Sequence, residues 1–155
     1  MNSINDEKNT RYSVFSVSGK LFGFEISSVR EVLPPPKVTY LPNVPTYVVG
    51  VFNLRGNILS LVDIHQILGL SSLEKKDTDM VLVVESFGFL LSFIVEQVLD
   101  FVEVENSKVK LQTGDMPADM AYFVRGIFEA DNMGRIYLLD TERLLDSNMV
   151  FVQEN

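Results

Sequence analysis

Apolar and polar residues alternate in short runs along most of the chain, which is the pattern typical of β-strands. In Leu21–Ile26, for example, Phe22, Phe24 and Ile26 stand at every second position and give the segment one apolar face. Runs of this kind, bounded by Gly, Pro, Asn or Asp, predict an all-β protein, mainly β with a few short helices. We predict strands over the following ranges: Arg11–Val17, Leu21–Ile26, Val38–Leu41, Gly50–Leu54, Ile58–Val62, Met80–Val84, Phe87–Ile94, Val98–Val104, Lys108–Leu111, Val124–Phe128 and Arg135–Leu139.

Short helices are predicted after two of these strands. Asp63 can accept hydrogen bonds from the first turn of a helix over Ile64–Leu68, and Gly69 can end that helix. Asp140 can cap a helix over Thr141–Leu145 in the same way.

Three further segments lack a regular alternation. Ser27–Leu33 ends in front of three prolines, and we predict a single helical turn followed by a strand there. Ser71–Thr78 is polar and charged and reads as a linker. Gln112–Ala121 contains Gly, Pro and Asp, and we predict a loop.

Four short patterns recur in the same order in the two halves of the chain. The offsets are 65, 66, 76 and 77 residues, so one insertion in the second half accounts for the change. Chance explains any one match in a β-rich sequence, but four in one order favour an internal duplication. The matched patterns are Phe22-Gly23-Phe24 with Phe87-Gly88-Phe89, Val29 and Val32-Leu33 with Val95 and Val98-Leu99, Gly50-Val51-Phe52 with Gly126-Ile127-Phe128, and Asp63 and Ile67-Leu68 with Asp140 and Leu144-Leu145.

The duplication predicts two small β-barrels within one domain, since each half alone is too short to bury a comfortable core. Exchange of strands between the halves stays open at this point. The predicted boundaries are a disordered tail at 1–10, one domain at 11–145 with halves at about 15–75 and 78–145, and a C-terminal tail at 146–155 with an edge strand around Val150–Val152.

The segment Gly50–Leu70 holds the feature that the duplication does not explain. Arg55-Gly56-Asn57 forms a turn between two apolar strands and places a Gly where a positive φ is easy. The charge of Arg55 needs a carboxylate or water as its partner, because burial alone is costly. The second half has Glu129-Ala130-Asp131-Asn132 where the first has Asn53-Leu54-Arg55-Gly56. A motif that only one copy contains is a candidate functional feature.

Composition and charge exclude several partners. The formal net charge of −8 argues against nucleic acid or an anionic membrane as the main partner. The chain has no Cys, so a disulfide scaffold and thiolate chemistry are excluded. Its most apolar run, Phe87–Val95, is too short to span a bilayer, and residues 1–11 show no signal peptide. We therefore expect a soluble, cytoplasmic protein with no nucleic acid and no direct membrane insertion.

Candidate catalytic residues are few. His65 is the single His and has no second His or Cys with which to share a metal, so we expect its side chain to be exposed and inert. No nucleophile elbow, phosphate-binding loop or dinucleotide motif occurs. Paired carboxylates such as Asp77 with Asp79, or Glu103 with Glu105, are typical of solvated surfaces. We expect no enzyme activity, no metal and no cofactor.

A binding function has more support. If Glu31 meets Arg55, the two can form a charge-assisted, bidentate pair that fixes the geometry between strands. The alternative is an exposed ion pair of little energetic value. Val29, Val32 and Leu33 exceed what one face of an edge strand needs, so they are either core residues or part of an exposed binding patch.

Over residues 11–145 the sequence resembles the CheW family, the coupling proteins of bacterial chemotaxis arrays. The most specific match is Asn53-Leu54-Arg55-Gly56 with the following strand Ile58–Val62. Ser60 and His65 depart from the family, which often has Pro and Arg at these positions. Further matching residues are Gly50, Asp63, Leu68-Gly69, Phe24-Glu25-Ile26, Val29-Arg30-Glu31-Val32, Leu41-Pro42, Pro45, Arg125-Gly126-Ile127 and Ile136–Leu145.

This resemblance implies two intertwined, SH3-like, five-stranded β-barrel subdomains. It also implies a non-enzymatic adaptor that binds the regulatory domain of the CheA histidine kinase and the cytoplasmic tip of methyl-accepting chemoreceptors. In the family, the receptor tip lies in the groove between the subdomains. Carried over by position, the receptor-binding groove includes Val29, Glu31, Val32, Asn53, Leu54 and Arg55, and the kinase contact includes Gly50.

Two other functions stay open on the sequence. The chain could be a coupling protein of another chemosensory pathway, such as surface motility. It could also be a small-ligand-binding or hydrolytic β-barrel protein that uses the groove between the barrels, although no nucleophile–base pair favours that function.

Overall fold

The computed structural model describes residues 8–71, 77–111 and 116–147. Within these residues the chain is mainly β with a few short helices, so the predicted fold class is confirmed. The elements are β1 (Asn9–Val17), β2 (Lys20–Glu25), η1 (Ile26–Ser28), β3 (Val29–Leu33), β4 (Val48–Leu54), β5 (Asn57–Asp63), α2 (Ile64–Ile67), β6 (Met80–Ser86), β7 (Phe89–Val95), β8 (Gln97–Glu105), η2 (Asn106–Lys108), α3 (Ala118–Phe123), β9 (Val124–Ala130), β10 (Gly134–Leu139) and α4 (Thr141–Asp146).

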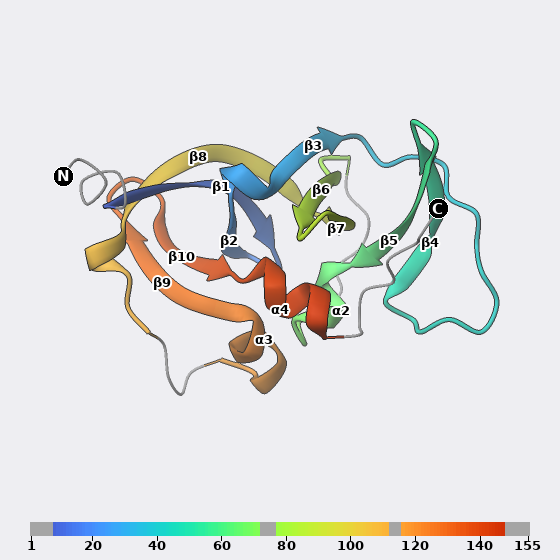
Figure 1. Cartoon of the computed structure of the whole chain (residues 1–155). Helices are drawn as coiled ribbons and strands as arrows, with labels where there is room; N and C mark the ends of the chain where they lie inside the picture. Colours follow the sequence, from blue (N-terminus) through green and yellow to red (C-terminus); the bar gives the residue numbers. More distant parts are fainter. Residues whose placement is uncertain (1–7, 72–76, 112–115, 148–155) are drawn as a thin grey trace.

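The strands form two five-stranded sheets, which lie side by side in Figure 1. Sheet A has the order β8-β1-β2-β10-β9, and sheet B has the order β3-β6-β7-β5-β4. The two orders are equivalent, because each strand of sheet A corresponds to the strand of sheet B that lies five places earlier or later in the chain; β8 corresponds to β3, and β1 to β6. Each sheet therefore combines two strands from one half of the chain with three from the other half. This exchange intertwines the halves and supports an internal duplication.

Two of the four sequence matches occupy equivalent places in the two sheets. Gly50 lies in β4 and Gly126 in β9, and each strand is joined by one isolated bridge to an extended segment before it. Asp63 and Asp140 cap α2 and α4, and both accept hydrogen bonds from backbone N–H groups of the first helical turn. The structure therefore supports these two equivalences.

The other two matches are out of register. Phe87-Gly88 forms the β6–β7 turn, with φ angles of 50° and 82°, and corresponds to Ser18-Gly19 in the β1–β2 turn, with φ angles of 52° and 76°. Phe22 lies inside β2 and so does not correspond to Phe87. Val29 begins β3, whereas Val95 ends β7. Matching these segments by similar residues therefore aligned a strand of one sheet with a turn of the other.

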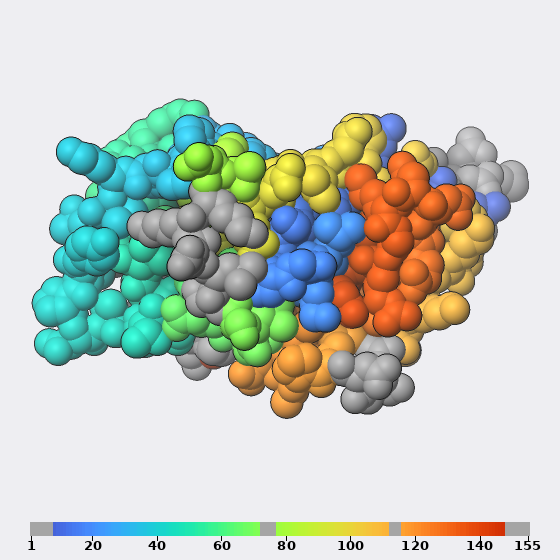
Figure 2. All heavy atoms as spheres, turned by 180° about the vertical axis from the view of Figure 1, so that it is seen from behind, coloured from blue at the N-terminus to red at the C-terminus, as the bar shows by residue number. Residues whose placement is uncertain are grey.

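One large apolar cluster joins the two sheets. It contains buried residues from strands of both sheets and from α2, α3 and α4, which lie together between the sheets (Figure 1). Phe24 of β2 is fully buried, and its ring centroid lies 5.3 Å from that of Phe15 and 5.8 Å from that of Phe93 in sheet B. In each of two smaller clusters the buried residues come from one sheet alone, from sheet A in one cluster and from sheet B in the other. In the space-filling view, the cyan segment before β4 lies at one end of the molecule, and the gold and orange segments that include β8, β9 and β10 lie toward the other (Figure 2).

The predicted loop Gln112–Ala121 is partly wrong, because Ala118–Phe123 forms α3. Met120 and Phe123 are three residues apart and both are buried, so the large apolar cluster stabilises a helix that local composition did not indicate. Pro117 stands immediately before the helix, where its missing N–H costs nothing.

Two predicted strands are reduced to single bridges. Thr39 pairs with Val51, and Lys110 pairs with Ile127, but neither segment continues along its partner. The prediction for Ser27–Leu33 is confirmed, since one 3₁₀ turn precedes β3.

Residues 9 and 10, which were assigned to the N-terminal tail, belong to β1, which begins at Asn9 and pairs with β8 from that residue. Predictions that fall on residues 1–7, 72–76, 112–115 and 148–155 lie outside the described residues, including the edge strand around Val150–Val152. In the described part of the chain, no helix has the length and apolar character needed to cross a membrane.

Candidate functional site

The β4–β5 hairpin ends in a two-residue turn that presents Arg55 to solvent. Arg55 and Gly56 have φ angles of 51° and 91°, as expected for tight hairpin turns that match the twist of β-strands. The Oδ1 atom of Asn53 accepts a hydrogen bond from the Gly56 N–H at 2.9 Å and holds the turn closed. Asn53 is exposed, whereas Leu54 is half-buried against the cluster inside sheet B. The Arg55 side chain is 72% exposed.

Arg55 forms a bidentate ion pair with Glu31. Its Nη1 donates to Oε1 at 2.5 Å and its Nη2 donates to Oε2 at 2.8 Å. These hydrogen bonds hold the pKa of Glu31 below its ordinary value and raise the pKa of Arg55 above its ordinary value. β3 and β4 are the two outer strands of sheet B, so the pair joins opposite edges of one sheet. The pairing expected from the sequence is present, and its role in binding stays a prediction.

A bulge in β3 divides the predicted groove residues between the two faces of sheet B. The register of β3 against β6 shifts between Val29 and Glu31. Val29 and Val32 lie opposite residues of the cluster between the sheets, whereas Glu31 lies opposite Val83, which belongs to the cluster inside sheet B. Residues directly opposite each other share a face, so the two valines face one way and Glu31 the other. Val29 packs against the large cluster, and Val32 is 39% exposed.

Exposed apolar side chains lie at the same end of sheet B as the Arg55 turn. β5 and β7 are parallel neighbours, so the turns that precede them lie at one end of the sheet. Phe87 in the β6–β7 turn is 74% exposed, and Ile58 and Phe89 near the starts of β5 and β7 are 40% and 41% exposed. The sequence pattern does not indicate this group, because it predicts that Phe87 lies inside a strand rather than in a turn. Aromatic residues near a charged rim are typical of protein interfaces.

Gly50 is buried in β4, and its lack of a side chain has a structural reason. A Cβ atom there would lie 2.7 Å from the carbonyl oxygen of Thr39 and 3.0 Å from the Cβ of Val38. At the equivalent Gly126, a Cβ would collide with Val109. Close approach of the preceding segment therefore requires Gly in both copies, and a role of Gly50 in kinase binding stays a prediction.

The expectation that His65 is exposed is wrong. His65 is 7% exposed, and its ring lies between two carboxylates, with Nδ1 2.9 Å from Asp63 Oδ1 and Nε2 2.8 Å from Glu96 Oε2. Asp63 caps α2 and so brings its carboxylate next to the ring. Glu96 is 31 residues away, and no local sequence pattern indicates that contact.

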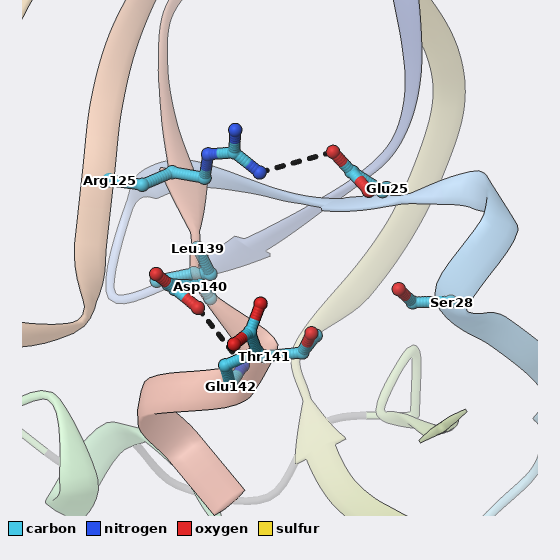
Figure 3. A pocket seen from close by; sticks show the side chains of 7 residues that line it. All are labelled: Glu25, Ser28, Arg125, Leu139, Asp140, Thr141 and Glu142. Atoms are coloured by element: carbon cyan, nitrogen blue, oxygen red, sulfur yellow. Dashed lines mark hydrogen bonds and ion pairs between the residues drawn. The ribbon is translucent and has the colours of Figure 1, made fainter. Parts of the chain in front are cut away.

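A small polar cavity lies where the ends of β2, β9 and β10 meet η1 and α4 (Figure 3). Its volume is about 70 Å³, far below the several hundred Å³ of pockets that hold drug-sized ligands. The Nη1 of Arg125 lies 3.1 Å from the Oε1 of Glu25 across the cavity, and Asp140 caps α4 beside them. Among the described residues, no group of three or more His, Asp or Glu side chains is placed to hold a metal ion. The lining residues are Glu25, Ser28, Arg125, Leu139, Asp140, Thr141 and Glu142.

Two intertwined five-stranded sheets, with a charged pair and apolar side chains exposed at one end, define a β-barrel scaffold whose surfaces suit protein contacts. Residues 11–149 match the family model of the CheW-like domain. The chain belongs to the CheW-like family.

Individual relatives agree with this assignment. The chain is 31% identical to Protein PilI of Pseudomonas aeruginosa over 117 residues, which cover 76% of this chain and 66% of PilI. It is 30% identical to the chemotaxis protein CheW of Rhizobium meliloti over 126 residues, which cover 81% of this chain and 79% of that protein. The crystal structure of the scaffolding protein TtCheW from Thermoanaerobacter tengcongensis superimposes with a TM-score of 0.81 at 24% identity, covering 93% and 99% of the two chains. The chain is a scaffold, or adaptor, protein of chemotaxis signalling.

Proposed function

We propose that the chain couples methyl-accepting chemoreceptors to a CheA-type histidine kinase and performs no chemical step itself. The observation that carries the proposal is the CheW-like match over residues 11–149, which includes both sheets and the Arg55 turn. The partners are the regulatory domain of the kinase and the cytoplasmic tip of the receptor, so the chain acts in the cytoplasm. Two surfaces of moderate affinity on one rigid unit can build an array by multivalency.

We assign the receptor contact to β3 and the β4–β5 turn. Glu31 occupies two of the five N–H donors of the Arg55 guanidinium, so the remaining donors are available to a partner. The ion pair also holds the exposed guanidinium in one orientation, which reduces the entropy lost when a partner binds. Val32 adds exposed apolar surface on β3. An amphipathic receptor helix can place apolar side chains on Val32 and polar side chains near Arg55.

We assign the kinase contact to the surface around Gly50. Gly50 itself is buried beneath Val38 and Thr39, so a partner there would contact this covering segment rather than Gly50. Lys37 and Tyr40 on either side are exposed, and Tyr40 is 75% exposed. An exposed Tyr provides a large contact area at low entropic cost.

Reconstitution tests the proposal. The purified chain is mixed with the regulatory domain of the CheA-type kinase from its own cell and with a cytoplasmic receptor fragment, and the mixture is separated by size-exclusion chromatography. We expect binary complexes with each partner and a ternary complex with both, and no complex with the kinase catalytic domain alone. A chain that elutes as free protein in every mixture would contradict the coupling function.

A second candidate function is supported by the 31% identity with PilI. The chain would then couple receptors to the kinase of another chemosensory pathway, such as one for surface motility. Co-purification from native cells decides between the two pathways, because it identifies the kinase that is retained.

A further inference from the structure

His65 lies between two carboxylates, the partly buried Asp63 and the buried Glu96, at the junction of the two sheets. The exposed fractions of the side chains are 9% for His65, 14% for Asp63 and 8% for Glu96. Both ring nitrogens are within hydrogen-bond distance of a carboxylate oxygen, at 2.9 Å and 2.8 Å. We call this arrangement of Asp63, His65 and Glu96 the His65 bridge.

The number of protons on the ring determines how many of the two carboxylate contacts are hydrogen bonds. A neutral imidazole has one N–H and one bare nitrogen, so it can donate to only one of two ionised carboxylates. The bare nitrogen would then face the lone pairs of the other carboxylate. The imidazolium form donates to both, so the complete bridge requires a proton on each ring nitrogen.

Glu96 connects this bridge to sheet A. It is the one residue between β7 of sheet B and β8 of sheet A, so the chain crosses between the sheets at this point. Its backbone N–H donates to the Ser16 carbonyl at 3.1 Å, and its Oε2 accepts from the Ser18 N–H at 2.9 Å. The Ser18 hydroxyl donates to the Ser71 carbonyl at 2.7 Å, in the segment that follows α2. The bridge therefore ties α2 to the β1–β2 turn through the crossover.

Among the described residues, the charged groups that face the ring are the carboxylates of Asp63 and Glu96. Asp63 stands at the end of β5 and also accepts a hydrogen bond from Gln66 of α2, and Glu96 stands at the crossover. The β1–β2 turn contributes the neutral backbone N–H of Ser18. The hydrogen bond with Asp63 raises the pKa of His65, burial opposes this rise, and the hydrogen bond with Glu96 adds to it.

We propose that the His65 bridge is a proton-dependent tie between the two sheets: it is complete when the ring carries two protons and loses one of its two ring contacts when the ring loses a proton. Loss of the Glu96 contact removes the link between the ring on α2 and the carboxylate that accepts from the β1–β2 turn. The relation between the sheets then becomes looser as the pH rises. An effect on receptor–kinase coupling rests in addition on the proposed function, whereas the tie itself does not.

The single His makes the test direct. In the full chain with labelled His, one Cε1–H resonance reports the titration of His65 without assignment. We expect a midpoint above the ordinary His value of about 6.5, and a shift of that midpoint toward the ordinary value in Glu96→Gln. Glu103→Gln, an exposed carboxylate on β8, is the matched control and should leave the midpoint unchanged. A wild-type midpoint at or below the ordinary value in the folded chain would overturn the proposal.

The backbone amide of Ser18 provides a second readout. Its chemical shift would not change if His65 titrated without a link to the β1–β2 turn. Its N–H donates to the carboxylate oxygen that faces the ring, so its ¹⁵N shift should change with the same midpoint as His65. A Ser18 amide that is constant across the His65 titration would contradict the tie, even if His65 titrates as expected. Both measurements use the chain without partners, so they are independent of the coupling function. If Glu96→Gln fails to fold, the wild-type midpoint and the Ser18 shift still decide whether the tie depends on the proton.

Discussion

Glu31 and Arg55 lie 24 residues apart in the sequence and form a bidentate ion pair between the outer strand β3 of sheet B and the turn that follows the other outer strand, β4. The corresponding hairpin of sheet A contains a different pair, in which Arg135 and Glu129 lie opposite each other within β9 and β10. The scaffold is thus duplicated, but the ion pair at this hairpin differs between the copies. In sheet B it joins the two edges of the sheet, whereas in sheet A it lies within one hairpin. A feature found in one copy of a duplicated scaffold is where a specific binding function is expected.

Arg55→Ala should weaken retention of a receptor fragment and leave the melting temperature almost unchanged. The side chain is 72% exposed, and both Arg and Ala carry a Cβ, so neither core packing nor the strain of the positive φ changes much. If Arg55 lies at the centre of the receptor contact, we expect a loss of about tenfold or more in affinity. Receptor pull-down and thermal melting on the same preparation measure both effects.

Arg135→Ala is the matched control for this variant. Arg135 is 52% exposed and its Nε lies 2.8 Å from Glu129 in the equivalent hairpin of sheet A, so the substitution also removes an exposed ion pair. We expect it to retain full receptor binding. Unfolding of Arg55→Ala at ordinary temperature would show that Arg55 is structural and that the receptor surface is misassigned.

Phe24→Ala should destabilise the fold by about 3–5 kcal/mol, the usual cost of removing a fully buried aromatic ring. The ring lies between Phe15 and Phe93 and so joins sheet A to sheet B. Denaturant unfolding gives the free energy, with Phe101→Ala as the control because that ring is 52% exposed. Equal losses for the two variants would mean that the cluster between the sheets does not carry the stability assigned to it.

Alternation of apolar residues was sufficient to predict most strands and the fold class, because a half-buried strand must place its apolar side chains at every second position. It was insufficient for α3, where Met120 and Phe123 are buried by contacts with other segments rather than by a long helical pattern. It also misaligned the repeats, because Phe87 stands in a turn with a positive φ, a conformation that local composition rarely assigns to Phe.

The sequence predicts the candidate site only as far as opposite charges suggest a pairing. The sequence predicts the pairing of Glu31 with Arg55, but the bulge that places Val29 on the face opposite Glu31 depends on the register with β6. The contact of His65 with Glu96 joins residues from the two halves of the chain. Contacts between distant segments are set by the packed fold and leave no periodic signal in the sequence.

Gly50→Ala should cost about 1–3 kcal/mol of stability, the range for overpacking a close contact. The new Cβ would meet a backbone carbonyl oxygen of Thr39 at 2.7 Å, and that atom cannot move without shifting the bridged segment. Gly126→Ala should cost less, because the nearest atom there belongs to the side chain of Val109, which can rotate. Unfolding free energies compare the two. Full stability of Gly50→Ala together with lost kinase binding would instead indicate a direct contact at Gly50.

The stability of the wild-type chain should fall as the pH rises through the pKa of folded His65. This pKa is raised in the folded state by the hydrogen bond with Asp63, against the effect of burial, and further by that with Glu96. The contribution is therefore complete below the pKa of the unfolded chain, about 6.5, and is lost above the raised value in the folded chain. Melting temperatures between about pH 6 and pH 9 measure this slope. His65→Gln cannot titrate and should give a flatter curve over the same range, while His65→Arg keeps the positive charge and should also be flat. Parallel curves for the wild type and His65→Gln would show that proton binding by His65 is not linked to folding.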